Sequence, residues 1–105
     1  MNSKAEFDEL INSIIEKFSP NKIILFGSRA MNNFTDESDY DLLVLKSGIE
    51  HKRKFAQDLY KLLLHRNIAV DFIVETPENY ESQKVNPYVI FNEITKYGKL
   101  IYERQ

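Results

Sequence analysis

The sequence contains no cysteine, so disulfide bonds and thiolate metal sites are excluded. No apolar run approaches the ~20 residues of a membrane-spanning helix, and the N-terminus is too acidic and polar for a signal peptide. With 14 basic and 16 acidic side chains and a pI near 5.7, the chain lacks the overall positive charge of a dedicated nucleic-acid binder. We therefore predict a cytoplasmic protein with no membrane partner and no nucleic acid as its main partner.

The length of 105 residues predicts a single domain over residues 1–105, with no repeat, low-complexity tract or internal linker. Such a chain is too short to hold a catalytic domain and a separate substrate-binding domain. We expect the wall opposite its active face to come from another chain. Whether that assembly is a homo-oligomer or a hetero-oligomer does not follow from the sequence.

Apolar periodicity predicts an α/β fold in which amphipathic helices flank a small central sheet. Whether this sheet is parallel or mixed does not follow from periodicity. A short helical turn is expected over 28–32, and a surface loop over 32–38. The expected strands are Lys22 to Phe26, Tyr40 to Leu45 and Ile68 to Val74, with a terminal extended piece over 100–102. The expected helices are Ser3 to Phe18, Glu50 to Arg66, one opened by Pro77, and one resuming at Tyr88 and closed by Gly98.

Three aspartates stand out because of their spacing in the predicted strands. Alternation along a strand places Asp39 and Asp41 on the same side, and Asp71 lies inside the third apolar run, where a carboxylate is costly without a cationic partner. If that strand is a neighbour, the third acid lies within about one ~4.8 Å strand spacing of the pair. Three ionised carboxylates this close raise one another's pKa unless a hard cation such as Mg²⁺ lies among them.

The segment Gly27-Ser28-Arg29 follows the first predicted strand and precedes the expected helical turn. Unpaired backbone N–H groups at such a position favour anions, and a glycine lets the backbone approach closely, so these residues are candidates for binding a triphosphate. Neither a Walker A pattern nor Gly-x-Gly-x-x-Gly is present. The residues thus indicate phosphoryl-type chemistry outside both of those families.

Taken together, Leu-Phe-Gly-Ser-Arg-Ala at 25–30, Ser-Asp-Tyr-Asp-Leu-Leu-Val at 38–44 and the isolated Asp71 resemble the minimal nucleotidyltransferase (MNT) family of the DNA polymerase β superfamily. The resemblance continues to the end of the chain, through Gly98 to Ile101-Tyr102-Glu103. It implies a mixed sheet flanked by helices, two Mg²⁺ ions held by Asp39 and Asp41 with Asp71 completing the triad, and nucleotide phosphates at Gly27-Ser28. Where the family commonly continues Arg-Ala-Arg-Gly, this chain has Met31-Asn32.

Proteins of this size in that family are often antitoxins of a HEPN-domain ribonuclease toxin, which they silence by transferring AMP from ATP to a toxin tyrosine. The resemblance therefore implies a Mg²⁺-dependent protein adenylyltransferase with ATP as substrate and a HEPN toxin as partner. One alternative is a non-catalytic antitoxin that neutralises its partner by occlusion, which the loss of a cation at Met31 favours. Another is a small-molecule nucleotidyltransferase, although such enzymes resemble longer, two-domain chains.

Simpler readings of the same residues stay open. The Asp39/Asp41 pair can be a polar loop end, Gly27-Ser28 an ordinary strand end and cap, and Asp71 the partner of a core cation. Arg29 can be a structural ion-pair partner rather than a phosphate ligand. The run Lys52-Arg53-Lys54 is most simply a solvated helix start.

Overall fold

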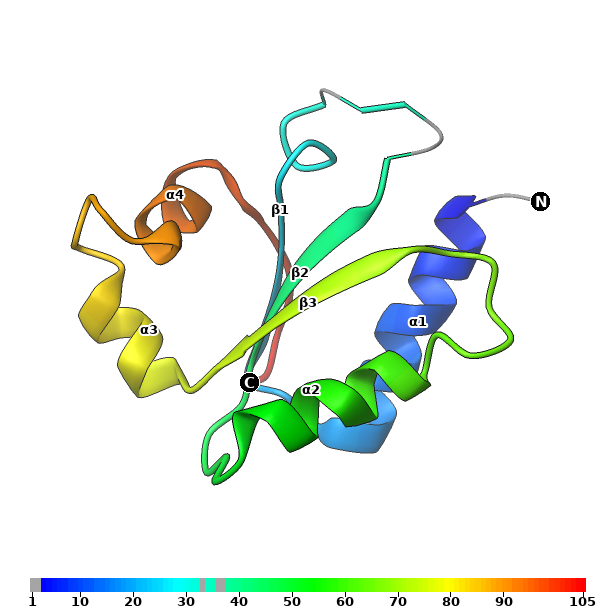
Figure 1. The fold of residues 1–105 in the computed structure, drawn as a ribbon, viewed down its shortest axis with the longest axis horizontal. Coiled ribbons are helices and arrows are strands. Elements are labelled where there is room, and N and C mark those ends of the chain that lie inside the picture. Colours follow the sequence, from blue (N-terminus) through cyan, green and yellow to red (C-terminus); the bar gives the residue numbers. More distant parts are fainter. Residues whose placement is uncertain (1–2, 33, 36–37) are drawn as a thin grey trace.

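A computed structural model describes residues 3–32, 34–35 and 38–105 of the chain. Its four strands form one mixed sheet in the order β3-β2-β1-β4, in which β1 is antiparallel to β2 and β4, and β2 is parallel to β3 (Figure 1). The strands are β1 (Lys22–Phe26), β2 (Tyr40–Leu45), β3 (Val70–Glu75) and β4 (Lys99–Glu103). The helices are α1 (Ser3–Phe18), α2 (Lys52–Lys61), α3 (Pro77–Gln83) and α4 (Ile90–Tyr97). The predicted α/β class with a mixed sheet is confirmed.

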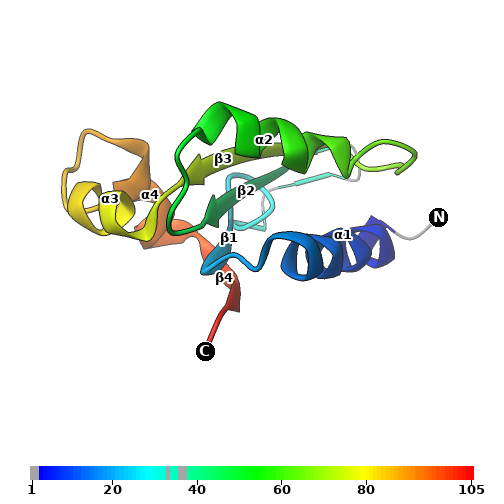
Figure 2. The ribbon, with the colours of Figure 1, turned by 90° about the horizontal axis from the view of Figure 1, so that it is seen from below.

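Helices cover both faces of the sheet, α1 and α2 on one side and α3 and α4 on the other (Figures 1 and 2). Successive residues of β2 alternate between the two cores that lie on the two faces of the sheet. Leu42 and Val44 pack in the core with α1 and α2, whereas Leu43 and Leu45 pack with α3 and α4. Because successive strand side chains point to opposite faces, every odd-numbered position of β2 belongs to the α3/α4 face.

The two helices after β3 begin and end where the sequence provides caps. The Thr76 hydroxyl accepts a hydrogen bond from the Asn79 N–H at 3.2 Å, and Pro77 occupies the first turn of α3. Gly98 ends α4, and its N–H donates to the Ile94 carbonyl at 2.7 Å. A Cβ at Gly98 would lie 2.9 Å from the Ile24 side chain, so this glycine allows α4 to end directly against β1.

The predicted boundaries of β1, β2 and α1 are confirmed, but those of the other strands and of two helices are wrong. α2 begins at Lys52 rather than Glu50, β3 ends at Glu75 rather than Val74, and β4 spans Lys99–Glu103 rather than 100–102. α2 ends at Lys61 rather than Arg66, because the chain continues in i to i+3 turns such as Leu63 N–H to Tyr60 O (3.0 Å) before His65 takes a positive φ of 68°. Strand β3 begins at Val70 rather than Ile68. Helix α4 begins at Ile90 rather than near Tyr88, which is 94% exposed.

None of the helices within the described residues is both long and apolar enough to cross a membrane.

Candidate active site

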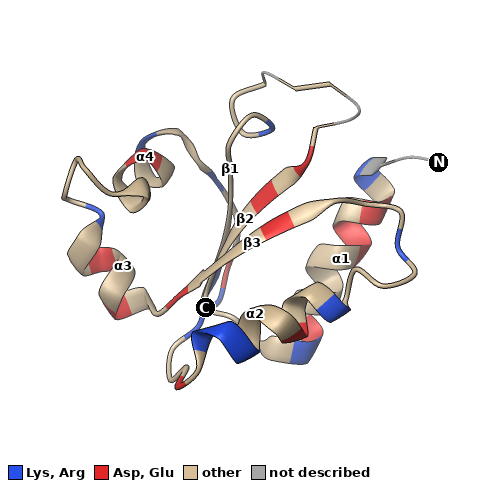
Figure 3. Cartoon of the chain, in the orientation of Figure 1, with Lys and Arg blue, Asp and Glu red and all other residues tan. Residues whose placement is uncertain are grey.

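Asp41 on β2 and Asp71 on β3 are aligned in the parallel ladder. Figure 3 shows acidic positions side by side on these two strands. Asp41 shares the α3/α4 face with Leu43, and Asp71 shares it with Ile73, because Tyr40 and Val70 point into the opposite core. Asp39 comes two residues before Asp41, just ahead of β2. The prediction that the third acid lies on a neighbouring strand is confirmed.

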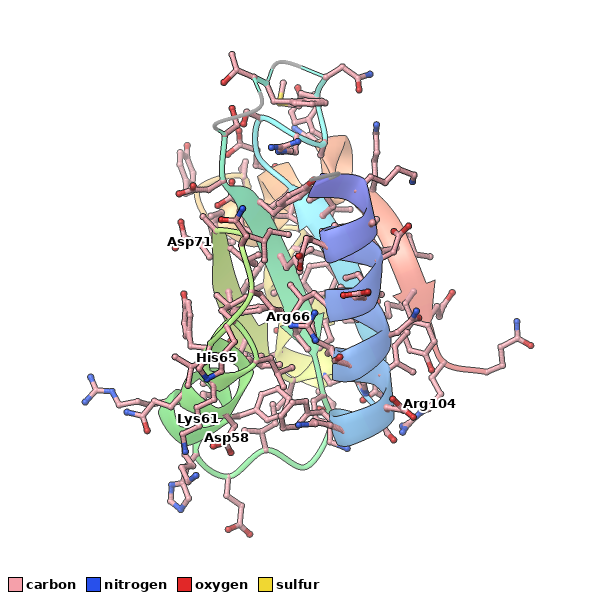
Figure 4. The ribbon with its side chains drawn as sticks, turned by 90° about the vertical axis from the view of Figure 1, so that its right-hand side faces the viewer. Asp58, Lys61, His65, Arg66, Asp71 and Arg104 are labelled. Atoms are coloured by element: carbon pink, nitrogen blue, oxygen red, sulfur yellow. The ribbon has the colours of Figure 1, made fainter. Side chains whose placement is uncertain are left out.

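The expectation that Asp71 is costly because it lies within an apolar run is wrong. Asp71 is exposed to solvent, as is Asp39, whereas Asp41 between them is half-buried. Figure 4 shows Asp71 toward the end of the sheet where β2 and β3 begin, well away from Asp58 and Lys61 on α2. The apolar residues of β3 on this face lie farther along the strand, where α3 packs, so the run does not bury its first carboxylate.

The pKa of Asp41 is raised above its ordinary value by burial and by the negative charges of Asp71 and Asp39. The pKa of Glu75, at the other end of β3, is instead lowered. Burial alone would raise the pKa of Glu75, but hydrogen bonds from the Thr76 N–H and other donors, together with Lys52 at 3.1 Å, hold it below its ordinary range. Asp41 therefore lies in a locally negative environment that a bound cation would relieve.

Gly27 brings the phosphate-binding candidate directly against Asp41. Its φ is +75°, and a Cβ placed on it would lie 2.3 Å from Asp41 Oδ2, a separation that atoms cannot adopt. Only a glycine allows both the backbone conformation and this contact. The turn and the acidic face therefore form one continuous surface.

Residues 28–32 form a turn, which matches the short helical turn expected from the sequence but does not extend into a helix. Two successive i to i+3 bonds define it, Ala30 N–H to Gly27 O at 3.1 Å and Met31 N–H to Ser28 O at 3.2 Å. The predicted phosphate binding by Gly27-Ser28 would therefore depend on the backbone of a turn, without the dipole of a full helix. Asn32 has a φ of 55°, a left-handed conformation that asparagine tolerates better than most residues other than glycine.

Arg29 holds the loop that leads into β2. Its side chain is buried, and its Nε and Nη2 donate to the Ser38 carbonyl at 3.2 and 2.9 Å. The guanidinium also lies over the rings of Phe34 at 4.6 Å and Tyr40 at 4.1 Å. These contacts fix the backbone on both sides of Asp39, so Arg29 acts as a positioning residue. Its predicted role in phosphate binding stays a prediction.

Sequence reasoning missed Tyr40 as a part of this arrangement. Its ring lies between Arg29 and the Phe7 ring, with the two ring centroids 4.4 Å apart. The available signal was an aromatic residue flanked by two aspartates and close in sequence to an arginine. Such a pattern indicates a cation–π contact as readily as a core residue.

Arg29→Lys is expected to reduce kcat of nucleotidyl transfer about tenfold and the free energy of unfolding by about 1–2 kcal/mol, because lysine cannot donate in parallel to Ser38 O or stack flat on Tyr40. Steady-state kinetics and urea unfolding measure the two effects. Arg104→Lys is the matched control, since Arg104 donates to the Ser19 carbonyl from an exposed position. Equal effects of the two substitutions would contradict a positioning role.

A metal site made only of protein ligands is not formed by the residues that the structure describes. No group of three or more His, Cys, Asp or Glu side chains among them converges on one point. Mg²⁺, however, is commonly bound by one or two carboxylates together with waters and substrate phosphates. The half-buried Asp41 with Asp71 or Asp39 beside it fits that kind of site, completed by the phosphates of a nucleotide.

Residues 8–105 match the family described as polymerase beta nucleotidyltransferase. This chain belongs to that nucleotidyltransferase family. Two proteins of Methanocaldococcus jannaschii, both provisionally named as protein adenylyltransferases, are similar over nearly the whole chain. One is 31% identical over 97% of this chain and 100% of its own length. The other is 32% identical over 92% of this chain and 69% of its own length.

A solved structure agrees with this nucleotidyltransferase fold. The crystal structure of a protein of Sulfolobus solfataricus, provisionally described as a nucleotidyltransferase, matches with a TM-score of 0.68 at 21% identity. The match covers 95% of this chain and 79% of that one. The family match over residues 8–105 confirms the predicted superfamily and the nucleotidyltransferase class. The dependence on Mg²⁺ and the site residues Gly27, Ser28, Arg29, Asp39, Asp41 and Asp71 stay predictions.

Proposed function

We propose that this nucleotidyltransferase transfers AMP from ATP to a hydroxyl group of another protein. The observation that carries the proposal is the position of Asp41, aligned with Asp71 on one side and in contact with the Gly27 turn on the other. A nucleotide whose phosphates contact the turn would place its α-phosphate beside the carboxylates. The names of the two Methanocaldococcus relatives favour a protein as the acceptor.

Each part of the site has a defined task in this reaction. The backbone of Gly27-Ser28 binds the phosphates, and Asp39, Asp41 and Asp71 are the residues that would hold Mg²⁺. When bound, such ions neutralise phosphate charge and favour in-line displacement. The acceptor oxygen forms a bond to the α-phosphorus, the bond from that phosphorus to the β-phosphate oxygen breaks, and pyrophosphate leaves. The hydroxyl proton passes to a carboxylate of this face or to water.

The acceptor that we propose is a tyrosine of a HEPN ribonuclease toxin, with this protein as its antitoxin. The resemblance to minimal nucleotidyltransferases suggests this partner. The exposure of Asp39 and Asp71 supports a macromolecular acceptor, because within the described residues nothing covers the acidic face on its solvent side. A protein could therefore approach the face directly and complete the site from outside.

The experiment is to incubate the protein with Mg²⁺, ATP and the product of the neighbouring gene, and to weigh the partner by mass spectrometry. We expect AMP adducts with the wild type and none with the double variant Asp39→Ala, Asp41→Ala. Asp58→Ala on α2 is a control that removes a carboxylate elsewhere, and it should leave the adduct unchanged. A partner that binds but keeps its mass would contradict the transferase proposal.

Neutralisation by occlusion is the second candidate, and Met31 favours it. This side chain is 53% exposed beside the turn, where the family commonly has a cationic arginine near the phosphates. An occluding antitoxin would silence its partner without ATP and equally well after loss of Asp39 and Asp41. Ribonuclease activity of the partner, measured with and without ATP, separates the two candidates.

A further inference from the structure

A cavity of about 190 Å³ lies beside the phosphate-binding candidate, between the end of β1 and α4. Its wall is largely apolar and includes Phe26, Gly27, Met31, Ile94 and Tyr97. Met31 and Tyr97 are 53% and 55% exposed, so their side chains remain accessible at its mouth. Glu93 is the one charged side chain of its lining. None of these residues except Gly27 has a part in the proposed reaction.

We propose that this cavity binds the base of the nucleotide whose phosphates contact Gly27-Ser28. The inference rests on the proposed function and assigns the residues that would recognise the base of its ATP. Gly27 belongs to both surfaces, touching Asp41 on the acidic face and lining the cavity, so one molecule can span them. The volume is below that of a site for a whole drug-sized ligand, and it suits one planar part of a larger molecule. Apolar walls and an aromatic ring at the mouth are the usual surroundings of a stacked base.

Glu93 gives the cavity a preference among bases. Its carboxylate accepts hydrogen bonds and, when ionised, cannot donate one. Within the described part of the chain it forms no ion pair that would occupy it. Adenine can donate to it from its exocyclic amino group, whereas hypoxanthine has a repelling carbonyl oxygen in that place and can donate only from its ring N1–H, one position away. The cavity therefore favours adenine over hypoxanthine, which differs in having an oxygen where adenine has that amino group.

The side chain of Met31 is better suited to a cavity that binds a base than to a turn that binds phosphates. An unbranched, polarizable side chain adapts to an aromatic surface and makes favourable sulfur–aromatic contacts. The same substitution that removes a cation from the turn thus adds apolar wall to the cavity. The change at this position suits base binding at the same turn.

The test measures equilibrium binding of ATP and of ITP, its hypoxanthine counterpart, in Mg²⁺ by isothermal titration calorimetry. Tyr97→Ala is expected to weaken ATP binding about tenfold or more through lost stacking, and Tyr97→Phe to restore it. Glu93→Gln, whose amide both donates and accepts, should bring the ATP and ITP affinities close together. Tyr88→Ala removes an exposed tyrosine outside the cavity and should bind ATP as the wild type does.

The outcomes separate this inference from the proposed function. Unchanged ATP affinity in Tyr97→Ala, or equal ATP and ITP affinity in the wild type, would overturn the base site. If Tyr97→Ala increased the KM for the acceptor protein and left the KM for ATP unchanged, the base site would also be overturned. The cavity would then be assigned to the acceptor. ATP binding with the expected discrimination but without AMP transfer would support the base site and contradict only the proposed transfer. A wild type that binds no nucleotide would contradict both.

Discussion

Asp41→Asn is expected to lower AMP transfer at least about 100-fold and, at the same time, to raise the melting temperature by a few degrees. Transfer falls because the substitution removes the carboxylate nearest the turn. The melting temperature rises because burial and the charges of Asp71 and Asp39 raise the pKa of Asp41, so its ionised form is less favourable in the folded protein than in the unfolded one. Scanning fluorimetry and a transfer assay measure the two effects.

The pH dependence of the Asp41→Asn effect provides its own control. At pH values above the raised pKa of Asp41, the ionised Asp41 carboxylate lowers the stability of the folded wild type, whereas the variant has no charge at this position. As the pH falls through that pKa toward the lower value of the unfolded chain, the wild-type carboxylate becomes protonated and the difference in melting temperature should disappear. Asp58→Asn should not raise the melting temperature, because Lys54 holds the pKa of Asp58 below its ordinary value. A variant less stable than the wild type at neutral pH would contradict this account.

Gly27→Ala is expected to reduce transfer at least about 100-fold, because the added Cβ would occupy the position of Asp41 Oδ2 and displace that carboxylate. The backbone conformation, with φ at +75°, adds strain of about 1–3 kcal/mol for a residue other than glycine. Steady-state transfer rates and urea unfolding measure the loss of activity and of stability.

Gly48→Ala is the control that separates the contact of Gly27 with Asp41 from the strain of a positive φ. Gly48 has nearly the same φ, +77°, but a Cβ there would meet nothing within 4 Å. Its substitution should lower stability through the backbone alone and leave transfer unchanged. If Gly27→Ala and Gly48→Ala reduce transfer equally, the contact between Gly27 and Asp41 has no part in the reaction.

The sequence predicts most of the sheet because short apolar runs and their bounding turns are local signals. The spacing of Asp39 and Asp41 predicts a common face by alternation along a strand, but β2 begins at Tyr40, so Asp39 lies just outside the strand to which that rule applies. The alignment of Asp71 with Asp41 is harder to predict from the sequence. It depends on the register of two parallel strands that are joined through α2, and neither strand encodes that register by itself.

Burial and loop geometry are the parts that the sequence does not reveal. Asp71 is exposed because the apolar contacts of α3 and α4 lie farther along β3, which follows from the tertiary path and not from the apolar neighbours of Asp71. Arg29 is buried because the loop returns Ser38 to its guanidinium, a contact across nine residues. The cavity beside Gly27 lies between β1 and α4, which are more than 60 residues apart in the sequence, so no local pattern predicts it.

We propose that the Gly27 turn and the aspartate face form one site for a nucleotide and its cation. The most direct measurement is calorimetric binding of ATP to the wild type and to Asp41→Asn, each with Mg²⁺ and with EDTA. We expect the wild type to bind ATP at least about tenfold more weakly in EDTA than in Mg²⁺. We expect Asp41→Asn to bind ATP more weakly than the wild type does in Mg²⁺, and nearly equally in both conditions. ATP bound equally tightly by both proteins, with and without Mg²⁺, would contradict this proposal.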